Sequence, residues 1–206
     1  MWFLLAISSA VIYSLRGVVE KFILKKIDKN ILGLSIRLYS IPFFALPFFL
    51  DPELFIPPAD LSTEFWVLVC YIGLISYPLE TVFYFKAMQK EDISLVMPIL
   101  SIHPVITLGL ALVVLNEVPN LFGAIGVILT TFGIYMLKIK HIHKGFFAPI
   151  IQLKNNLAVR YMLITATLIS IGTVIDKIAI STANVYMYAF VSHVLMSLSL
   201  LTIAIL

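Results

Sequence analysis

The chain alternates between long apolar runs and short polar connections. Seven of these runs are long enough to form a helix of about 20 residues, the length that crosses the hydrocarbon core of a membrane. They cover residues 2–24, 31–50, 65–86, 93–115, 120–138, 159–180 and 185–206. Charged residues and prolines separate the runs, for example at Lys25-Lys26 and at Lys90-Glu91-Asp92, as expected where helices end. The pattern predicts an all-α integral membrane protein that folds as a polytopic helical bundle.

Composition supports lipid as the solvent of this chain. Apolar residues make up 61% of the sequence and charged residues 12%, and the mean hydropathy is +1.07. A soluble core of 206 residues cannot hide that much apolar surface. The net charge of +3 does not indicate a nucleic-acid partner, because the basic residues are confined to a few loops.

The distribution of basic residues predicts the orientation in the membrane. They follow the first, third and fifth apolar runs, at Lys25, Lys26, Lys29, Lys86, Lys90, Lys138, Lys140, Lys144, Lys154 and Arg160. Connections rich in Lys and Arg face the cytoplasm. The connection at 51–64 carries acidic residues and no base, so we expect it and the amino terminus to face outward. We expect a multi-pass protein of the prokaryotic cell (inner) membrane.

Two segments of the chain resemble each other. Residues 14–22 (SLRGVVEKF) return at 170–178 (SIGTVIDKI), 156 residues later, so that Glu20-Lys21 corresponds to Asp176-Lys177. Five predicted helices precede the second copy, which therefore enters the bilayer from the opposite side, as in many secondary transporters. We predict a five-helix repeat at 1–139, a cytoplasmic basic linker at 140–158, and two helices of an inverted second repeat at 159–206.

The second predicted repeat has two helices where the first has five. The chain ends in the apolar stretch Leu200 to Leu206. We therefore expect a fragment or a split reading frame that lacks a carboxy-terminal half, with a natural seven-helix protein as the alternative.

Ionisable residues within the predicted spans are candidates for function. A charge at the bilayer centre costs about 2.5 to 3.5 kcal/mol on insertion scales. At a rise of about 1.5 Å per residue, Arg16, Arg37 and Glu80 fall at one level, roughly 9 Å from the cytoplasmic face, and could meet there. Arg16 and Glu20 are also spaced i, i+4, so that pairing between them, or anchoring of Glu20 near the interface, is the alternative to a role in transport.

Two histidines are further candidates. His103 lies near the middle of the fourth run, between Pro98 and Pro104, and these prolines predict a local bend or unwinding of the helix. His193 corresponds to Arg37 at the same offset of 156 residues. A packing role remains the alternative for both.

The fifth run contains glycines at helical spacing. Gly123, Gly126 and Gly133 predict positions where this helix packs closely against a neighbour, because small residues let membrane helices approach.

Residues 83–139 resemble a known family. The resemblance is carried by the aromatic segment Phe83 to Met88, by Ile93 to Pro98, by His103 to Thr107, by Leu115 to Glu117 and by the glycines from Gly123 to Gly133. These segments resemble the EamA-domain branch of the drug/metabolite transporter superfamily. The resemblance implies ten helices in two inverted halves around a cavity that opens alternately to either side. Two features depart from the family, since the second half is incomplete and family members usually have the amino terminus inside.

We therefore predict a secondary transporter of small organic metabolites, such as amino acid-like solutes, other polar solutes or drugs. A seven-helix channel or membrane assembly subunit is the alternative. The predicted substrate-binding residues are Arg16, Arg37, Glu80, His103 and His193, and the predicted ion-coupling residues are Glu20, Glu80 and Asp176. We expect protons as the coupled ion, and a homo-oligomer as one further form of partner. We expect no cofactor, no metal site and no enzyme activity. An intramembrane metallohydrolase would need clustered metal ligands, and the chain has no H-E-x-x-H motif.

Overall fold

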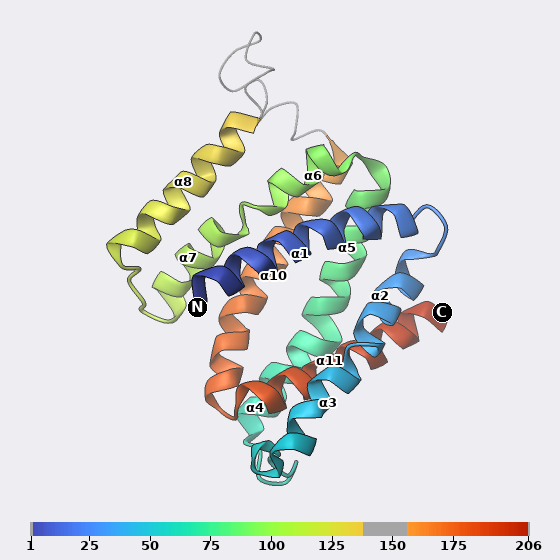
Figure 1. The fold of residues 1–206 in the computed structure, drawn as a ribbon, viewed down its shortest axis with the longest axis vertical. Helices are drawn as coiled ribbons and strands as arrows, with labels where there is room; N and C mark the ends of the chain where they lie inside the picture. Colours follow the sequence, from blue (N-terminus) through green and yellow to red (C-terminus); the bar gives the residue numbers. More distant parts are fainter. Residues whose placement is uncertain (1, 138–155, 206) are drawn as a thin grey trace.

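The computed structural model describes residues 2–137 and 156–205, which form helices and no strand (Figure 1). The elements are α1 (Trp2–Ile23), α2 (Lys29–Leu38), α3 (Ile41–Leu50), the 3-10 turn η1 (Pro52–Leu54), α4 (Thr63–Cys70), the π-helical turn η2 (Tyr71–Ser76), α5 (Tyr77–Lys90), α6 (Ile93–Leu100), α7 (His103–Val114), α8 (Leu121–Leu137), α10 (Leu157–Ser181) and α11 (Val185–Ile205). The predicted all-α polytopic bundle is confirmed. Most of the predicted linker at 140–158 lies outside the described residues.

Five stretches among the described residues are long and apolar enough to cross a membrane. They cover 29–50, 63–90, 93–114, 157–181 and 185–205, and each coincides with a predicted run to within a few residues. α1 adds an apolar helix of 22 residues, and α8 adds one of 17 residues. The positions of the spans therefore follow the hydropathy of the sequence.

Two of the spans are broken, and prolines explain both breaks. The fourth run divides after Leu100 into α6 and α7, as Pro98 and Pro104 predict. The second run divides at Tyr39 and Ser40, just before Pro42, and this break was not predicted. In both places proline removes a backbone donor and its ring collides with the preceding turn.

The packed centre of the bundle is formed by α5 and α10. Met88 of α5 and Met162 of α10 lie fully buried in one apolar cluster. Two glycines allow close approach elsewhere: a Cβ on Gly33 would lie 2.8 Å from Thr81 of α5, and one on Gly73 would lie 2.5 Å from Leu195 of α11.

The predicted close packing along the fifth run is wrong for two of its three glycines. A Cβ on Gly126 or Gly133 would meet nothing within 4 Å among the described residues, and one on Gly123 would meet only Asn120 and Pro119 of the preceding loop. The reason is the position of α8, which lies at the edge of the bundle (Figure 1).

The two similar segments run in opposite directions. Lys21, near the end of α1, donates a hydrogen bond to the Glu91 carbonyl oxygen at 2.6 Å. Asn156, the N-cap of α10, donates to the Glu91 side chain at 2.8 Å. α1 therefore ends where α10 begins, at the end of the bundle where α5 also ends. This geometry agrees with an inverted second copy, while the division of the chain into repeats stays a prediction.

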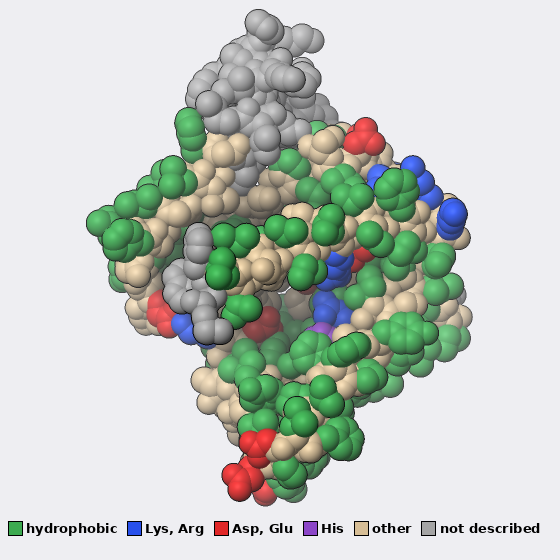
Figure 2. Space-filling view, viewed as in Figure 1, with side chains coloured by type: hydrophobic (Ala, Val, Ile, Leu, Met, Phe, Trp, Pro, Cys, Tyr) green, Lys and Arg blue, Asp and Glu red, His purple; other side chains and the backbone are tan. Residues whose placement is uncertain are grey.

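Charged side chains gather at the ends of the bundle. Figure 2 shows basic side chains where α1 ends and α2 begins, and acidic side chains at the bottom of the view, around the connection from α3 to α4. This separation is the one on which the predicted orientation depends.

Candidate functional site

A cavity of about 340 Å³ lies between α1, α2, α5, α10 and α11. Five predicted site residues line it, one from each helix: Arg16, Arg37, Glu80, Asp176 and His193. Figure 2 shows the hollow beneath α1, with basic, acidic and histidine side chains inside it. Polar groups of both signs are thus collected within an otherwise apolar bundle.

Arg37 is held from two sides and keeps its charge unpaired. Its Nε donates to the hydroxyl of Tyr77, and its Nη1 lies 2.8 Å from Nε2 of His193. The guanidinium carbon also lies 3.9 Å from the centroid of the Tyr77 ring, a cation–π arrangement. Among the described residues, no carboxylate lies within ion-pair distance of Arg37. Its positive charge is therefore available to an anionic group in the cavity.

The hydrogen bonds of His193 define its role beside Arg37. Nδ1 lies 2.8 Å from the carbonyl oxygen of Ala189, which can only accept, so Nδ1 carries the proton. Nε2 then accepts from Arg37, which can only donate. The ring of Phe44 lies 4.2 Å from the imidazole, centroid to centroid. His193 is thus a neutral ring that orients the guanidinium, and the two residues separated by 156 positions are in direct contact.

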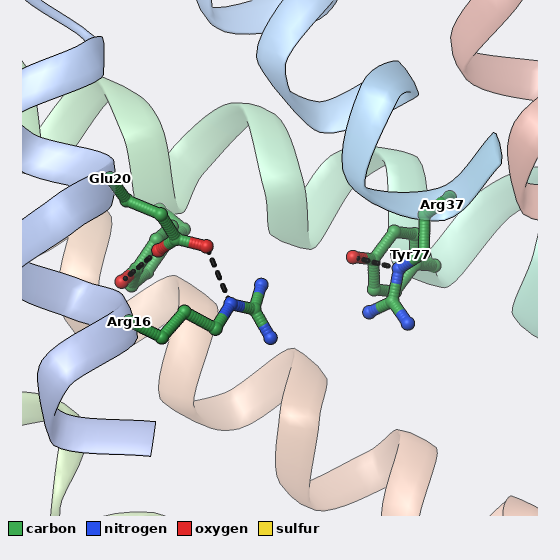
Figure 3. A network of polar contacts seen from close by, with 5 residues as sticks. Arg16, Glu20, Arg37 and Tyr77 are labelled. Carbon is green, nitrogen blue, oxygen red and sulfur yellow. Dashed lines mark hydrogen bonds and ion pairs between the residues drawn. The ribbon is translucent and has the colours of Figure 1, made fainter. Parts of the chain in front are cut away.

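Arg16 lies on the opposite wall of the cavity from Arg37, on α1. Its Nε donates to Oε1 of Glu20 at 2.6 Å, and the hydroxyl of Tyr84 donates to Oε2 at 2.9 Å (Figure 3). Glu20 is buried, so both oxygens of its carboxylate are satisfied within the protein. Figure 3 shows the outer nitrogens of Arg16 and Arg37 directed toward the same gap. Arg16 therefore pairs with Glu20 and still offers donors to the cavity.

Of the two carboxylates that line the cavity, Glu80 is the one without a hydrogen bond or ion pair among the described residues. It is partly buried on α5, lines the cavity and makes no hydrogen bond or ion pair with any described residue. Membrane proteins place ionisable groups of this kind along substrate and ion pathways.

The helix before Glu80 contains an unusual turn. The π-helical turn η2 ends at Ser76, immediately before Tyr77 and Pro78. Pro78 has no backbone N–H, so the regular hydrogen-bond ladder cannot continue through it, and the widened turn changes the direction of the side chains that follow. π-turns inside helices are frequent at functional sites. This turn was not predicted from the sequence, although Pro78 inside an apolar span is a signal for it.

Asp176 receives one hydrogen bond, from the hydroxyl of Tyr188 on α11. It is partly buried and lines the cavity. Tyr188 was missed in the sequence, although a signal exists: the two residues lie at similar distances from the connection between α10 and α11, so antiparallel helices bring them to one depth.

His103 lies apart from the other predicted site residues, of which Glu20 is the second that does not line the cavity. His103 begins α7 and does not line the cavity described above. Its carbonyl oxygen accepts a hydrogen bond at 3.0 Å from Ser170, which is fully buried on α10. A substrate-binding role for His103 stays a prediction.

The fold and the cavity define the class of this protein as a multi-pass helical membrane protein with a polar internal site. Residues 1–139 match the EamA-like transporter family, and the chain belongs to that family. The predicted resemblance is thereby confirmed, and the family is one of transporters, not of enzymes. No curated protein and no solved structure matches the chain.

Proposed function

We propose that this protein is a secondary carrier that moves a small polar organic solute across the membrane by alternating access. The observation that supports the proposal best is the cavity, which contains Arg37 and Glu80; neither has an oppositely charged group within ion-pair distance among the described residues. Groups of this kind are costly in lipid. A bound solute and a proton would compensate them.

In this proposal the two arginines bind the anionic group of the solute. Arg37 is oriented by Tyr77 and His193, and the free nitrogens of Arg16 lie across the gap. A guanidinium binds carboxylate or phosphate oxygens through parallel N–H groups. The solute then lies between α1 and α2.

Glu80 is the residue we assign to proton coupling. Glu20 was predicted for the same role, but both its oxygens already accept hydrogen bonds from Arg16 and Tyr84. Asp176 accepts one hydrogen bond, from Tyr188, so it has fewer hydrogen bonds than Glu20 and more than Glu80. Release of the proton from Glu80 on one side of the membrane would link the cycle to the proton gradient.

The test is uptake into proteoliposomes of paired solutes that differ by one negative charge, such as glutamate with glutamine, or glucose 6-phosphate with glucose. Arg37→Ala should weaken the apparent affinity for the anionic member of a transported pair by about 10- to 100-fold, since a hydrogen bond to a charged group is worth about 1.5 to 3 kcal/mol. The neutral member should lose much less.

Arg160→Ala is the matched control, because Arg160 is exposed at the start of α10 and does not line the cavity. It should leave both affinities as they are. An equal loss for both members of a pair in Arg37→Ala would remove the recognition role. Ion conductance that does not saturate with solute would support the channel alternative instead.

A further inference from the structure

Within the part of the chain that the structure describes, two buried polar side-chain atoms outside the cavity have no hydrogen-bond partner. Nδ1 of His103 and Oγ1 of Thr107 are both inaccessible to solvent, and neither makes a hydrogen bond with any part of the chain that the structure describes. A buried polar group without a hydrogen bond costs about 1 to 3 kcal/mol. Two of them on one helix therefore indicate that something polar binds there.

The spacing of these atoms fits one small ligand. His103 and Thr107 are four residues apart on α7, so their side chains lie on one face, with Cβ atoms about 5 to 6 Å apart. One molecule that forms a hydrogen bond of about 2.8 Å with each atom spans that gap. A water molecule suits both partners, because it donates and accepts, whichever nitrogen of the imidazole carries the proton.

A third polar group lies beside the pair. Oγ of Ser170 on α10 is 3.0 Å from the carbonyl oxygen of His103 and 2.7 Å from that of Ala166. Since the hydroxyl proton serves these carbonyls, the lone pairs of Ser170 remain free to accept. Buried waters bind two to four protein groups; His103 and Thr107 supply two, and the Ser170 hydroxyl lies next to the backbone of His103.

The site adjoins the break between α6 and α7. Pro104 has no N–H to offer to the carbonyl of Leu100, one turn earlier. Broken backbone is tolerated at membrane depth where side chains or ordered water satisfy the freed groups. The sequence thus places a helix break and a pair of unpartnered side-chain atoms within one turn of each other.

We propose that His103 and Thr107 bind one buried water molecule, which links the first turn of α7 to Ser170 of α10 beside the break. This assignment is independent of the proposed carrier function. It gives His103 a role in holding the broken helix against α10.

A double-mutant cycle tests the proposal on the full chain in lipid or mild detergent. Thr107→Val and His103→Phe should each lower the melting temperature by about 2 to 4 °C, since loss of the water leaves the other polar atom unsatisfied. The double variant should lose little more than one single variant, because both changes remove the same water. Thr107→Ser keeps the hydroxyl and should retain the coupling to His103→Phe.

The matched control is Thr165→Val, on α10. Thr165 is fully buried, and its hydroxyl donates to the Tyr161 carbonyl of its own helix at 3.0 Å. Its effect should add to that of His103→Phe without coupling. A higher or unchanged melting temperature in Thr107→Val would overturn the proposal, since removal of a dry, unpartnered hydroxyl relieves its desolvation cost. Additive effects of Thr107→Val and His103→Phe would also overturn it.

Discussion

Glu20 and Asp176 occupy the same place in the two similar segments but have different surroundings. Glu20 is 3% exposed and accepts hydrogen bonds at both carboxylate oxygens, from Arg16 and from Tyr84. Asp176 is partly buried, lines the cavity and accepts from Tyr188. Equivalent positions in the sequence therefore do not imply equivalent chemistry.

The lysines that follow the two acids differ in the same way. Lys21 donates to the carbonyl oxygens of Met88 and Glu91, at the end of α5. Lys177 forms an ion pair with Glu117 in which both side chains are more than half exposed, 57% and 51%. The first segment is thus fixed by buried polar contacts, and the second is fixed mainly by the packing of α10 against α5 and α7.

The largest expected effect comes from truncation of the two acids. Glu20→Ala should lower the free energy of unfolding by about 3 kcal/mol, because it removes two hydrogen bonds to a buried carboxylate, one from Arg16 and one from the partly buried Tyr84. Asp176→Ala should cost about 1 kcal/mol, since the hydroxyl of Tyr188, the donor to Asp176, can form a hydrogen bond with water in the cavity instead. Equilibrium unfolding in mild detergent measures both. Equal losses of stability in the two variants would mean that the two carboxylates contribute equally to the fold, against this comparison.

The next effect concerns the tyrosines that donate to the two acids. Tyr84→Phe should cost about 1.5 kcal/mol and Tyr188→Phe about 0.5 kcal/mol, because Glu20 has no route to water while Asp176 faces the cavity. Unfolding measurements on both variants check the order. A larger loss of stability in Tyr188→Phe than in Tyr84→Phe would contradict the difference in burial between Glu20 and Asp176.

The smallest effect concerns the lysines. Lys177→Ala should change stability by less than about 0.5 kcal/mol, because exposed ion pairs contribute little and are screened by salt. Lys21→Ala should cost about 1 kcal/mol, since two backbone carbonyls lose their donor. Thermal unfolding at low and high salt distinguishes the two lysines. High salt should reduce the loss of stability caused by Lys177→Ala and should not change the loss caused by Lys21→Ala. The same salt response in both variants would contradict the assignment.

Much of this architecture could be predicted because a membrane span is a matter of length and hydropathy. The break in the fourth run followed from Pro98 and Pro104. Depth along a span also follows from residue number alone, and Arg16, Arg37 and Glu80 do line one cavity. Arg37 and His193, which are separated by the same 156 residues as the two similar segments, are in direct contact.

The features that could not be predicted depend on the rotation of each helix about its axis. An apolar helix such as α8 or α10 carries little pattern that shows which face meets a neighbour. For this reason the sequence did not show that the glycines in close contact with a neighbouring helix are Gly33 and Gly73, and not those of α8. For the same reason the sequence did not predict the hydrogen bond from Tyr84 to Glu20, nor that His103 does not line the cavity.

The most direct test of the proposed carrier is uptake into proteoliposomes with and without an imposed pH gradient between pH 5 and 8. The wild-type protein should show uptake that the gradient stimulates, and Glu80→Gln should lose this stimulation because an amide cannot exchange a proton. Glu64→Gln, a change at an exposed position at the start of α4, should keep it. Full stimulation in Glu80→Gln would contradict the account.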